Sequence, residues 1–287
     1  MIANVNGKIC GGDDAVVSVF DHGFVFGEGV YETLRTYERR PFLLERHLQR
    51  LRASAAMIDL ALPLDDAEIG RRIAETIAAV EGGTEVYLRI LVTPGPGEFS
   101  YDPTARRNPT FVIIARTFAP PSPGLYAMGV TITVVSISRS QPNSVNPLIK
   151  SNNLLPNAMA MREAMRRGAY EGLMLNYRGE ITECTQSNFF IVKQDAILTP
   201  PLESGLLAGI TRELIIECAR ETGVPLEETV IRMHDLLTAD EAFLSSTTRE
   251  LVPVVQVDRH VIGTGQPGAV TTRLLGAFRE RAVRLSR

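Results

Sequence analysis

Two stretches near the start of the chain repeat their apolar residues with the spacing of a helix. The first follows Pro41 and the second begins near Asp65. Their apolar positions are Leu44, Leu48, Leu51, Ala55 and Ile58 in the first stretch, and Ile69, Ile73, Ile77 and Val80 in the second. Because residues three or four apart lie on one face of a helix, each stretch predicts a helix with one buried side. Before them we expect a hairpin that turns at Asn6-Gly7 and has its second strand over 15–20.

Shorter apolar runs predict a mixture of strands and helices in the rest of the chain. We expect strands over 86–92, 110–117, 130–138, 173–176, 188–192, 241–245 and 253–257, and helices over 154–167, over 209–221 and at the end of the chain. Three prolines within 119–124 cannot continue a helix or a central strand. The fold class expected is therefore α+β, with a small N-terminal domain over 1–118, an interdomain linker over 119–125 and a larger C-terminal domain over 126–287.

Composition and charge exclude several classes of partner. The 287 residues carry a formal net charge of -3, without the basic surface that nucleic-acid binding requires. No apolar run is long enough to span a bilayer, so we expect no membrane partner. Three widely separated cysteines suggest neither a metal site nor a disulfide framework, and they fit the reducing cytoplasm. The expected partners are small molecules.

Lysine is scarce in this chain, since only Lys8, Lys150 and Lys193 are present. A lysine that forms a Schiff base must be held partly away from water, which makes its neutral amine available as a nucleophile. Lys8 lies in the predicted turn and Lys193 at a predicted hairpin bend. Lys150 instead has apolar residues on both sides, where a strand gives way to a helix. It is the candidate for covalent chemistry, although a lysine at a strand end can also simply extend to solvent.

Three further segments could bind an anionic cofactor. The helix that begins at Gly209 offers backbone N–H groups and the Thr211 hydroxyl, a combination suited to a phosphate. A run of hydroxyl residues over 245–248 follows a predicted strand. Glu183 lies at a strand edge and could pair with a protonated ring nitrogen. Taken singly, each segment also fits an ordinary capped helix, a polar loop or a surface acid.

Together these segments resemble the class IV aminotransferases, which are fold-type IV enzymes dependent on pyridoxal 5'-phosphate. The resemblance covers residues 1–260 and rests on six blocks in the right order. The blocks are 20–32 (FDHGFVFGEGVYE), 46–51 (RHLQRL), 150–155 (KSNNLL), 182–189 (TECTQSNF), 209–212 (GITR) and 246–248 (STT). Each block alone has little specificity, whereas their order is specific for the superfamily. The resemblance implies a homodimer whose larger domain has a barrel-like sheet.

The resemblance also implies a role for individual residues. Lys150 is the Schiff-base lysine and the proton shuttle at the substrate carbon. The other cofactor-binding residues implied are Glu183 at the pyridine nitrogen, Arg50, Ile210, Thr211, Thr247 and Thr248 at the phosphate, and Leu206 against the ring. These residue types suit those tasks, because a guanidinium and a helix dipole favour a dianion and a carboxylate favours a pyridinium.

The substrate is expected to be a branched-chain L-amino acid, with a 2-oxo acid such as 2-oxoglutarate as amino acceptor. Tyr87 and Arg89 resemble the Tyr-x-Arg of branched-chain enzymes, and Tyr31 matches a position in the pocket wall. The residues after the lysine are closer to those of D-amino acid aminotransferases, but the Arg-x-His carboxylate trap of those enzymes has no counterpart over 94–101.

Other activities remain open from the sequence. Within the superfamily they are (R)-amine transamination and the aminodeoxychorismate lyase reaction, whose pattern resembles Thr182–Cys184. A non-catalytic protein that binds the cofactor and a cofactor-free Schiff-base aldolase are alternatives of other classes. The joint presence of Lys150, Glu183 and Arg50 disfavours the non-catalytic protein. An aldolase without cofactor would leave the phosphate-binding pattern unexplained.

Overall fold

The structure, a computed structural model, describes residues 1–102, 108–139 and 144–286, and its chain divides into two compact units. The first unit consists of Met1–Ala119, Ile149–Asn153 and Leu285–Arg287, and the second of Pro120–Leu148 and Leu154–Arg284. This division differs from the predicted domains at two short segments. Lys150 was expected in the larger domain, but its segment belongs to the first unit.

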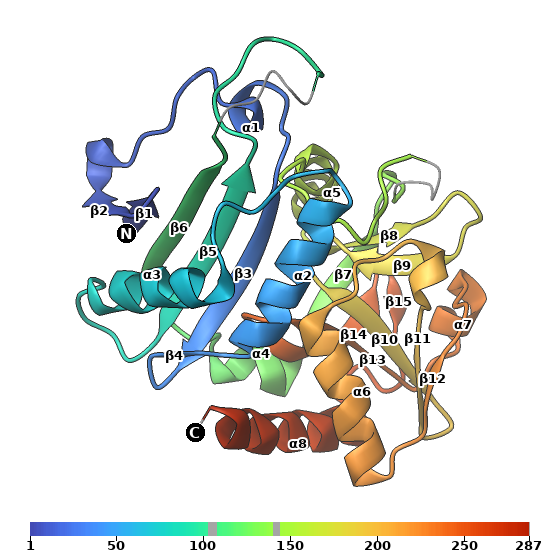
Figure 1. Ribbon diagram of the computed structural model, residues 1–287. Helices are drawn as coiled ribbons and strands as arrows, with labels where there is room; N and C mark the ends of the chain where they lie inside the picture. Colours follow the sequence, from blue (N-terminus) through green and yellow to red (C-terminus); the bar gives the residue numbers. More distant parts are fainter. Residues whose placement is uncertain (103–107, 140–143, 287) are drawn as a thin grey trace. The chain divides into compact units, whose positions relative to one another are not determined.

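The first unit is built on a six-stranded antiparallel sheet with the order β2-β1-β6-β5-β3-β4. Its strands are β1 (Ile2–Val5), β2 (Lys8–Gly11), β3 (Val30–Tyr37), β4 (Arg40–Pro41), β5 (Val86–Thr93) and β6 (Thr110–Thr117). Its helices are the 3-10 helix η1 (Gly12–Asp14), α1 (His22–Val25), α2 (Leu44–Ala56) and α3 (Asp66–Ala78) (Figure 1). The expected helices after Pro41 and near Asp65 are both present.

The predicted position of the second hairpin strand is wrong. The strand is β2, which pairs with β1 directly across Asn6-Gly7, while 15–20 contain neither helix nor strand. Asn6 and Gly7 both have positive φ, at 51° and 97°. Such a two-residue turn reverses the chain at once, so the returning strand begins at Lys8.

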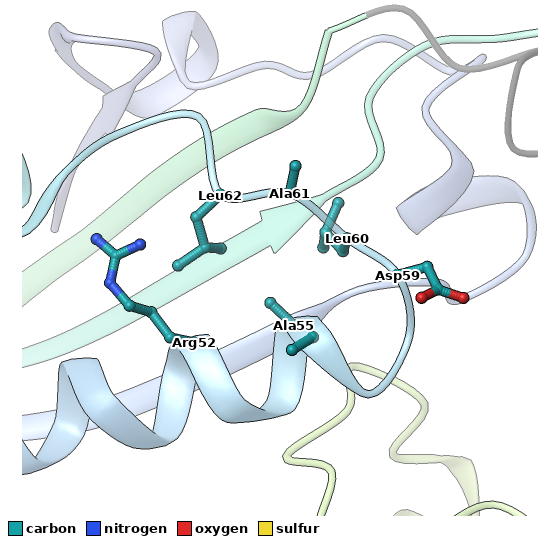
Figure 2. Close-up of a pocket in the computed structure, with 7 residues that line it drawn as sticks. Arg52, Ala55, Asp59, Leu60, Ala61 and Leu62 are labelled. Atoms are coloured by element: carbon teal, nitrogen blue, oxygen red, sulfur yellow. The ribbon is translucent and has the colours of Figure 1, made fainter.

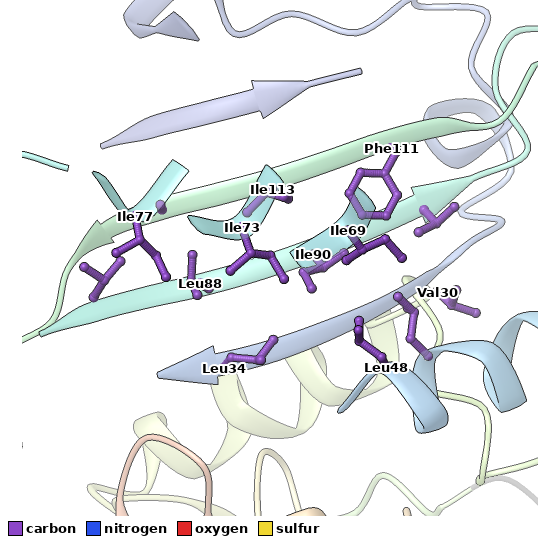
Figure 3. Close-up of a cluster of buried hydrophobic side chains, with 14 of the residues drawn as sticks. Val30, Leu34, Leu48, Ile69, Ile73, Ile77, Leu88, Ile90, Phe111 and Ile113 are labelled. Carbon is purple, nitrogen blue, oxygen red and sulfur yellow. The ribbon is translucent and has the colours of Figure 1, made fainter. Parts of the chain in front are cut away.

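Alternation along the strands separates the two faces of this sheet. On β5, Val86, Leu88, Ile90 and Val92 are fully buried, while the residues between them are partly exposed. Figure 3 shows Leu88 and Ile90 of β5 beside the apolar stripe of α3, and Leu48 of α2 beside β3. The same face of β3 carries Val30, Glu32 and Leu34, so one carboxylate lies within an otherwise apolar layer.

The second unit has a barrel-like sheet, as predicted. Its strands are β7 (Val130–Val134), β8 (Gly172–Leu175), β9 (Ile181–Cys184), β10 (Asn188–Lys193), β11 (Ala196–Thr199), β12 (Leu226–Glu228), β13 (Glu241–Ser246), β14 (Glu250–Val257) and β15 (His260–Val261). Six of them follow the order β10-β13-β14-β7-β8-β9. Because β9 also pairs with β10, these six strands close into a ring.

The helices of the second unit are α4 (Pro123–Met128), α5 (Leu155–Arg166), the 3-10 helix η3 (Leu202–Ser204), α6 (Ile210–Thr222), α7 (Met233–Leu237) and α8 (Ala269–Leu285), whose last residue belongs to the first unit (Figure 1). The expected linker over 119–125 therefore ends inside α4. Pro123 starts this helix without disrupting it, because the first turn of a helix needs no N–H donor from proline. No helix within the described ranges combines the length and the apolar character needed to cross a membrane.

Candidate active site

Lys150 lies in a short extended segment that pairs with the start of β3. The Tyr31 N–H donates to the Lys150 carbonyl at 2.9 Å, and the Asn152 N–H donates to the Gly29 carbonyl at 2.9 Å. The hydroxyl of Ser54, on α2, accepts the Lys150 N–H at 3.1 Å. Lys150 is thus fixed by backbone bonds on both sides, and α5 begins only at Leu155.

The Lys150 amine and a guanidinium both contact one aromatic ring. The Lys150 Nζ is 4.5 Å from the centre of the Tyr31 ring, and the Arg89 Cζ is also 4.5 Å from it. Tyr31 on β3 and Arg89 on β5 belong to the sheet face opposite α2 and α3, which the strand alternation requires. The Arg89 Nε is buried and has no hydrogen-bond partner within the described residues.

Tyr87 is not brought to the same point. It precedes Arg89 by two residues on β5, and its ring contacts the Arg116 guanidinium at 4.9 Å. Of the three residues predicted to contact substrate, Tyr31 therefore contacts both Lys150 and Arg89, and Tyr87 has a different partner.

Arg50 is held by a buried carboxylate from the sheet. Its Nε and Nη2 donate to the two oxygens of Glu32 at 2.7 and 2.8 Å, and the His47 Nδ1 lies 2.7 Å from the second oxygen. Burial raises the pKa of Glu32, but Arg50 and His47 outweigh it and hold that pKa far below its usual range. Burial lowers the pKa of His47, and the charges of Arg50 and Lys150 lower it further against the attraction of Glu32. The group is therefore an ionised glutamate with an arginine and a neutral histidine.

In the second unit, Glu183 is a nearly buried carboxylate with several donors around it. Arg139 forms an ion pair with its Oε1 at 2.8 Å. Its Oε2 accepts the Leu207 N–H at 3.1 Å and the Asn188 side-chain amide at 3.3 Å. The same amide donates to the Leu207 carbonyl at 2.9 Å, so Asn188 fixes Leu207 and Glu183 together. The alternative that Glu183 is a surface acid is wrong, because its side chain is buried.

The start of α6 presents backbone donors without a competing side chain. Its N-cap is Gly209, which cannot form a side-chain cap, and Ile210 and Thr211 supply the first-turn N–H groups. Only glycine fits at the N-cap, because an added Cβ would lie 1.9 Å from the Asn188 Oδ1. The glycine therefore lets the α6 N-terminus approach the residues that hold Glu183.

Thr247 and Thr248 form the turn between β13 and β14. The turn is closed by pairing of Ser246 with Glu250, whose φ is 57°. Arg249 anchors it, because its guanidinium contacts Glu171 at 2.9 Å and the Ser246 hydroxyl at 3.1 Å. Both threonines are half-buried.

Leu206, which the sequence reading placed against the cofactor ring, is fully enclosed by protein. Leu207 is half-buried and has the backbone N–H that donates to Glu183. The sequence reading also missed Glu32, Asn188 and Arg139. Only Glu32 left a local signal, as the single charged residue on the buried face of an apolar strand; the partners of Glu183 are tertiary contacts that no spacing reveals.

A surface hollow of about 350 Å³ lies elsewhere in the first unit, between the end of α2 and the following loop (Figure 2). Its lining includes Ala55, Leu60 and Leu62, with Arg52 and Asp59 at its edge. It contains no lysine, and it lacks the convergent polar groups that a cofactor site requires.

Comparison with known proteins gives the same identity as these features. Residues 29–257 match the family model described as "Amino-transferase class IV". The chain belongs to the class IV aminotransferases. It is accordingly a transaminase that depends on pyridoxal 5'-phosphate, and its described elements form the fold-type IV architecture.

Individual class IV aminotransferases resemble the chain over nearly its whole length. A putative branched-chain-amino-acid aminotransferase of Methanocaldococcus jannaschii is 37% identical, over 96% of this chain and 94% of its own. A D-alanine aminotransferase of Bacillus licheniformis is 33% identical, over 95% and 94%. A crystal structure of the branched-chain aminotransferase of Thermoproteus uzoniensis with norvaline has a TM-score of 0.91 and 31% identity, and covers 100% of this chain and 96% of its own.

The residues of each unit fit the chemistry of this cofactor. In the first unit, a fixed lysine amine and a clamped guanidinium suit an aldehyde and a phosphate. In the second, the glycine-capped start of α6 suits a phosphate and the Glu183 carboxylate suits a pyridinium. The buried Ser245 hydroxyl, beside the turn of Thr247 and Thr248, has no hydrogen-bond partner within the described residues. Such an orphaned group is consistent with a site built for a polar ligand.

The contact at Gly209 predicts a strong effect of one added methyl group. Gly209→Ala forces Asn188 and the start of α6 apart, so we expect transaminase activity to fall by on the order of 100-fold, as a displacement of about 1 Å does in a catalytic site. Gly276→Ala is the matched control, because a Cβ there meets nothing within 4 Å. Steady-state kinetics measures both variants, and equal activity in the two would contradict the steric role of Gly209.

The lowered pKa of His47 predicts a pH-dependent stability. Below pH 6.5 the unfolded chain binds a proton that native His47 does not, so the free energy of unfolding falls as the pH falls. The slope due to this residue reaches at most about 1.4 kcal/mol per pH unit. Urea unfolding between pH 7 and pH 5 should show this slope in the wild type and in the exposed-site control His260→Gln. It should be missing in His47→Gln, and an unchanged slope in that variant would refute the assignment.

Proposed function

We propose that this transaminase acts on branched-chain L-amino acids, with a 2-oxo acid such as 2-oxoglutarate as the amino acceptor. Support comes from the M. jannaschii relative and the T. uzoniensis structure, both of which have names of branched-chain enzymes. The observation that carries the proposal is the arrangement of Lys150 and Arg89 on the Tyr31 ring. It provides a nucleophilic amine, an apolar wall and a carboxylate-binding cation within one small volume of the first unit.

Arg89 is suited to the carboxylate of the substrates. A guanidinium matches a carboxylate through two parallel N–H donors, and the Arg89 Nε is a buried donor with no partner within the described residues. Tyr31 sets the spacing, because both cations contact its ring at 4.5 Å. An amino acid whose nitrogen lies next to Lys150 can then direct a carboxylate to Arg89. Tyr87 contributes through the position of β5 and not by direct contact.

Each unit supplies its own part of the cofactor-binding set. In the first unit, Lys150 carries the cofactor and Arg50 binds its phosphate. In the second unit, Glu183 accepts a hydrogen bond from the protonated pyridine nitrogen, and Leu207, in place of Leu206, lies against the ring. The remaining phosphate ligands are Ile210 and Thr211 at the start of α6, with Thr247 and Thr248 at the β13–β14 turn.

Lys150 is the residue that moves the proton. When bound, pyridoxal 5'-phosphate supplies an electron sink that stabilises negative charge at the substrate α-carbon. The Lys150 Nζ would take the proton from that carbon and pass it to the cofactor, and with the 2-oxo acid it would carry a proton in the reverse direction. Its backbone is fixed by Tyr31 and Ser54, so the amine moves only by rotation of its own side chain.

Replacement of the lysine should abolish turnover. We expect Lys150→Ala to lower kcat by at least about 10³-fold, because no other described lysine contacts Tyr31. Lys193→Ala is the control, since the Lys193 amine is exposed and donates to the Thr238 hydroxyl at 3.0 Å. Borohydride reduction of the holoenzyme followed by peptide mass spectrometry should place the cofactor on Lys150. Cofactor found on Lys8 or Lys193 would rule out the assignment.

The substrate proposal is tested by a panel of amino donors. L-leucine, L-valine and L-isoleucine should convert the holoenzyme spectrum to that of the aminated cofactor and support turnover with 2-oxoglutarate. D-alanine and (R)-1-phenylethylamine should give at most about 1% of that kcat/KM. The D-alanine aminotransferase relative makes transamination of D-amino acids the second candidate. Turnover of D-alanine above that of L-leucine would establish this second activity instead.

We also propose that the chain forms a homodimer and acts in the cytoplasm. The first unit exposes Phe24, Phe99 and Tyr101 at 71%, 72% and 84%, and aromatic residues of this kind are enriched in contact surfaces. The three cysteines are free, as in a reducing compartment. Sedimentation equilibrium should give twice the 31.5 kDa of one chain, and Phe99→Ser together with Tyr101→Ser should shift the protein towards monomer. A wild-type monomer at micromolar concentration would exclude the dimer.

A further inference from the structure

Burial of the Glu32 carboxylate costs desolvation free energy that an apolar residue at this position would not cost. Glu32 is fully enclosed on the helix-covered face of β3, among Val30 and Leu34. Removing a carboxylate from water costs several kcal/mol unless donors replace the lost solvent. Four contacts do so: Arg50 through two nitrogens, the His47 Nδ1, and the Thr33 N–H at 3.3 Å. An apolar side chain would fill this position without the cost, so the carboxylate must serve the groups that it binds.

The exposed fractions of the Glu32, His47 and Arg50 side chains show which part of this group faces outward. The side chains of Glu32 and His47 are 0% and 1% exposed, whereas Arg50 is 13% exposed. The carboxylate and the imidazole therefore form the enclosed base of the group, and the guanidinium is its outward end. Because the ionised carboxylate only accepts hydrogen bonds, the His47 Nδ1 carries the proton. The imidazole is therefore a second donor that holds the Glu32 carboxylate in place.

The geometry of the bond fixes the plane of the guanidinium. Glu32 engages the Nε and Nη2 edge of the Arg50 fork with two parallel bonds of 2.7 and 2.8 Å. A free arginine side chain has about 2 kcal/mol of rotamer entropy, which an anion must overcome on binding. The clamp removes this cost beforehand and orients the guanidinium, whose N–H donors suit the oxygens of a phosphate.

We propose that Glu32 and His47 are positioning residues that hold Arg50 ready for the cofactor phosphate. This inference rests on the proposed role of Arg50. Glu32 lies next to Tyr31 on β3, so one strand sets both the aromatic wall beside Lys150 and the orientation of the phosphate ligand. The residues act on the phosphate group alone, and their loss weakens the binding of phosphorylated cofactor while leaving the recognition of the ring unchanged.

Pyridoxal, which lacks the phosphate, provides the probe that separates positioning from general stability. The full-length protein is freed of cofactor, and the Kd values of pyridoxal 5'-phosphate and pyridoxal are measured by spectroscopic titration. We expect Glu32→Gln to raise the Kd of the phosphorylated form by about tenfold or more and that of pyridoxal by less than about twofold. Partial unfolding lowers the active fraction equally for both ligands, so the ratio of the two constants is insensitive to it.

Two further variants complete the experiment. His47→Gln, which keeps an N–H donor, should preserve the ratio better than His47→Leu. Glu163→Gln removes another buried, arginine-paired carboxylate, in the second unit, and should leave the ratio at the wild-type value. At saturating pyridoxal 5'-phosphate, Glu32→Gln should recover a kcat within a few-fold of wild type, because its defect lies in cofactor affinity.

Arg50→Gln distinguishes failure of this inference from failure of the proposed site. If Arg50→Gln changes the ratio but Glu32→Gln weakens both ligands equally or neither, Glu32 is a structural residue and the inference is overturned. If Arg50→Gln leaves the ratio unchanged, the role of Arg50 at the phosphate is itself wrong and the inference falls with it. A selective loss of phosphorylated cofactor in both variants supports the proposal.

Discussion

The first unit depends on one buried charge. The alternation of β3 turns Glu32 into the apolar layer beneath α2, where it is stable only while Arg50 and His47 bind it. The same helix face carries Ser54, which accepts the Lys150 N–H, because positions 47, 50 and 54 are three and four residues apart. Sheet, helix and lysine segment are therefore joined by a single set of polar contacts, and a shift of α2 along β3 would disturb all of them together.

The two faces of the sheet divide the chemistry between neighbouring residues. Tyr31 and Arg89 lie on the face away from the helices, where the Tyr31 ring contacts both the Lys150 amine and the Arg89 guanidinium. Glu32 lies on the other face, where it restrains Arg50. Strand geometry alone produces this division, since consecutive side chains point in opposite directions. In the second unit Asn188 plays a comparable part, because one amide joins Glu183 and the Leu207 carbonyl beside the start of α6.

Local patterns in the sequence predicted which helices and strands are present better than they predicted the residues at which these begin and end. The helical repeats gave α2 and α3, because an amphipathic stripe follows directly from residue spacing. The strand after Asn6-Gly7 was misplaced because its burial is low, and α4 was missed because Pro123 was read as a breaker. The order of six short blocks identified the cofactor chemistry and the candidate residues. Asn188 and Arg139 escaped notice as partners of Glu183 because long-range contacts leave no spacing in the sequence, whereas Glu32 left a local signal in the alternation of β3 that was not used.

The grouping of Ile149–Asn153 with the first unit has a consequence for the synthesis of the chain. The path passes from one unit to the other at four points, so neither unit is a continuous piece of sequence. When β3 leaves the ribosome, the segment that pairs with Gly29 and Tyr31 is still about 120 residues from being made, which at 5–20 residues per second is roughly ten seconds of translation. Throughout that interval the edge of β3 that later binds the lysine segment lacks this partner, so the first unit cannot complete its pairing until the chain has passed once through the second unit.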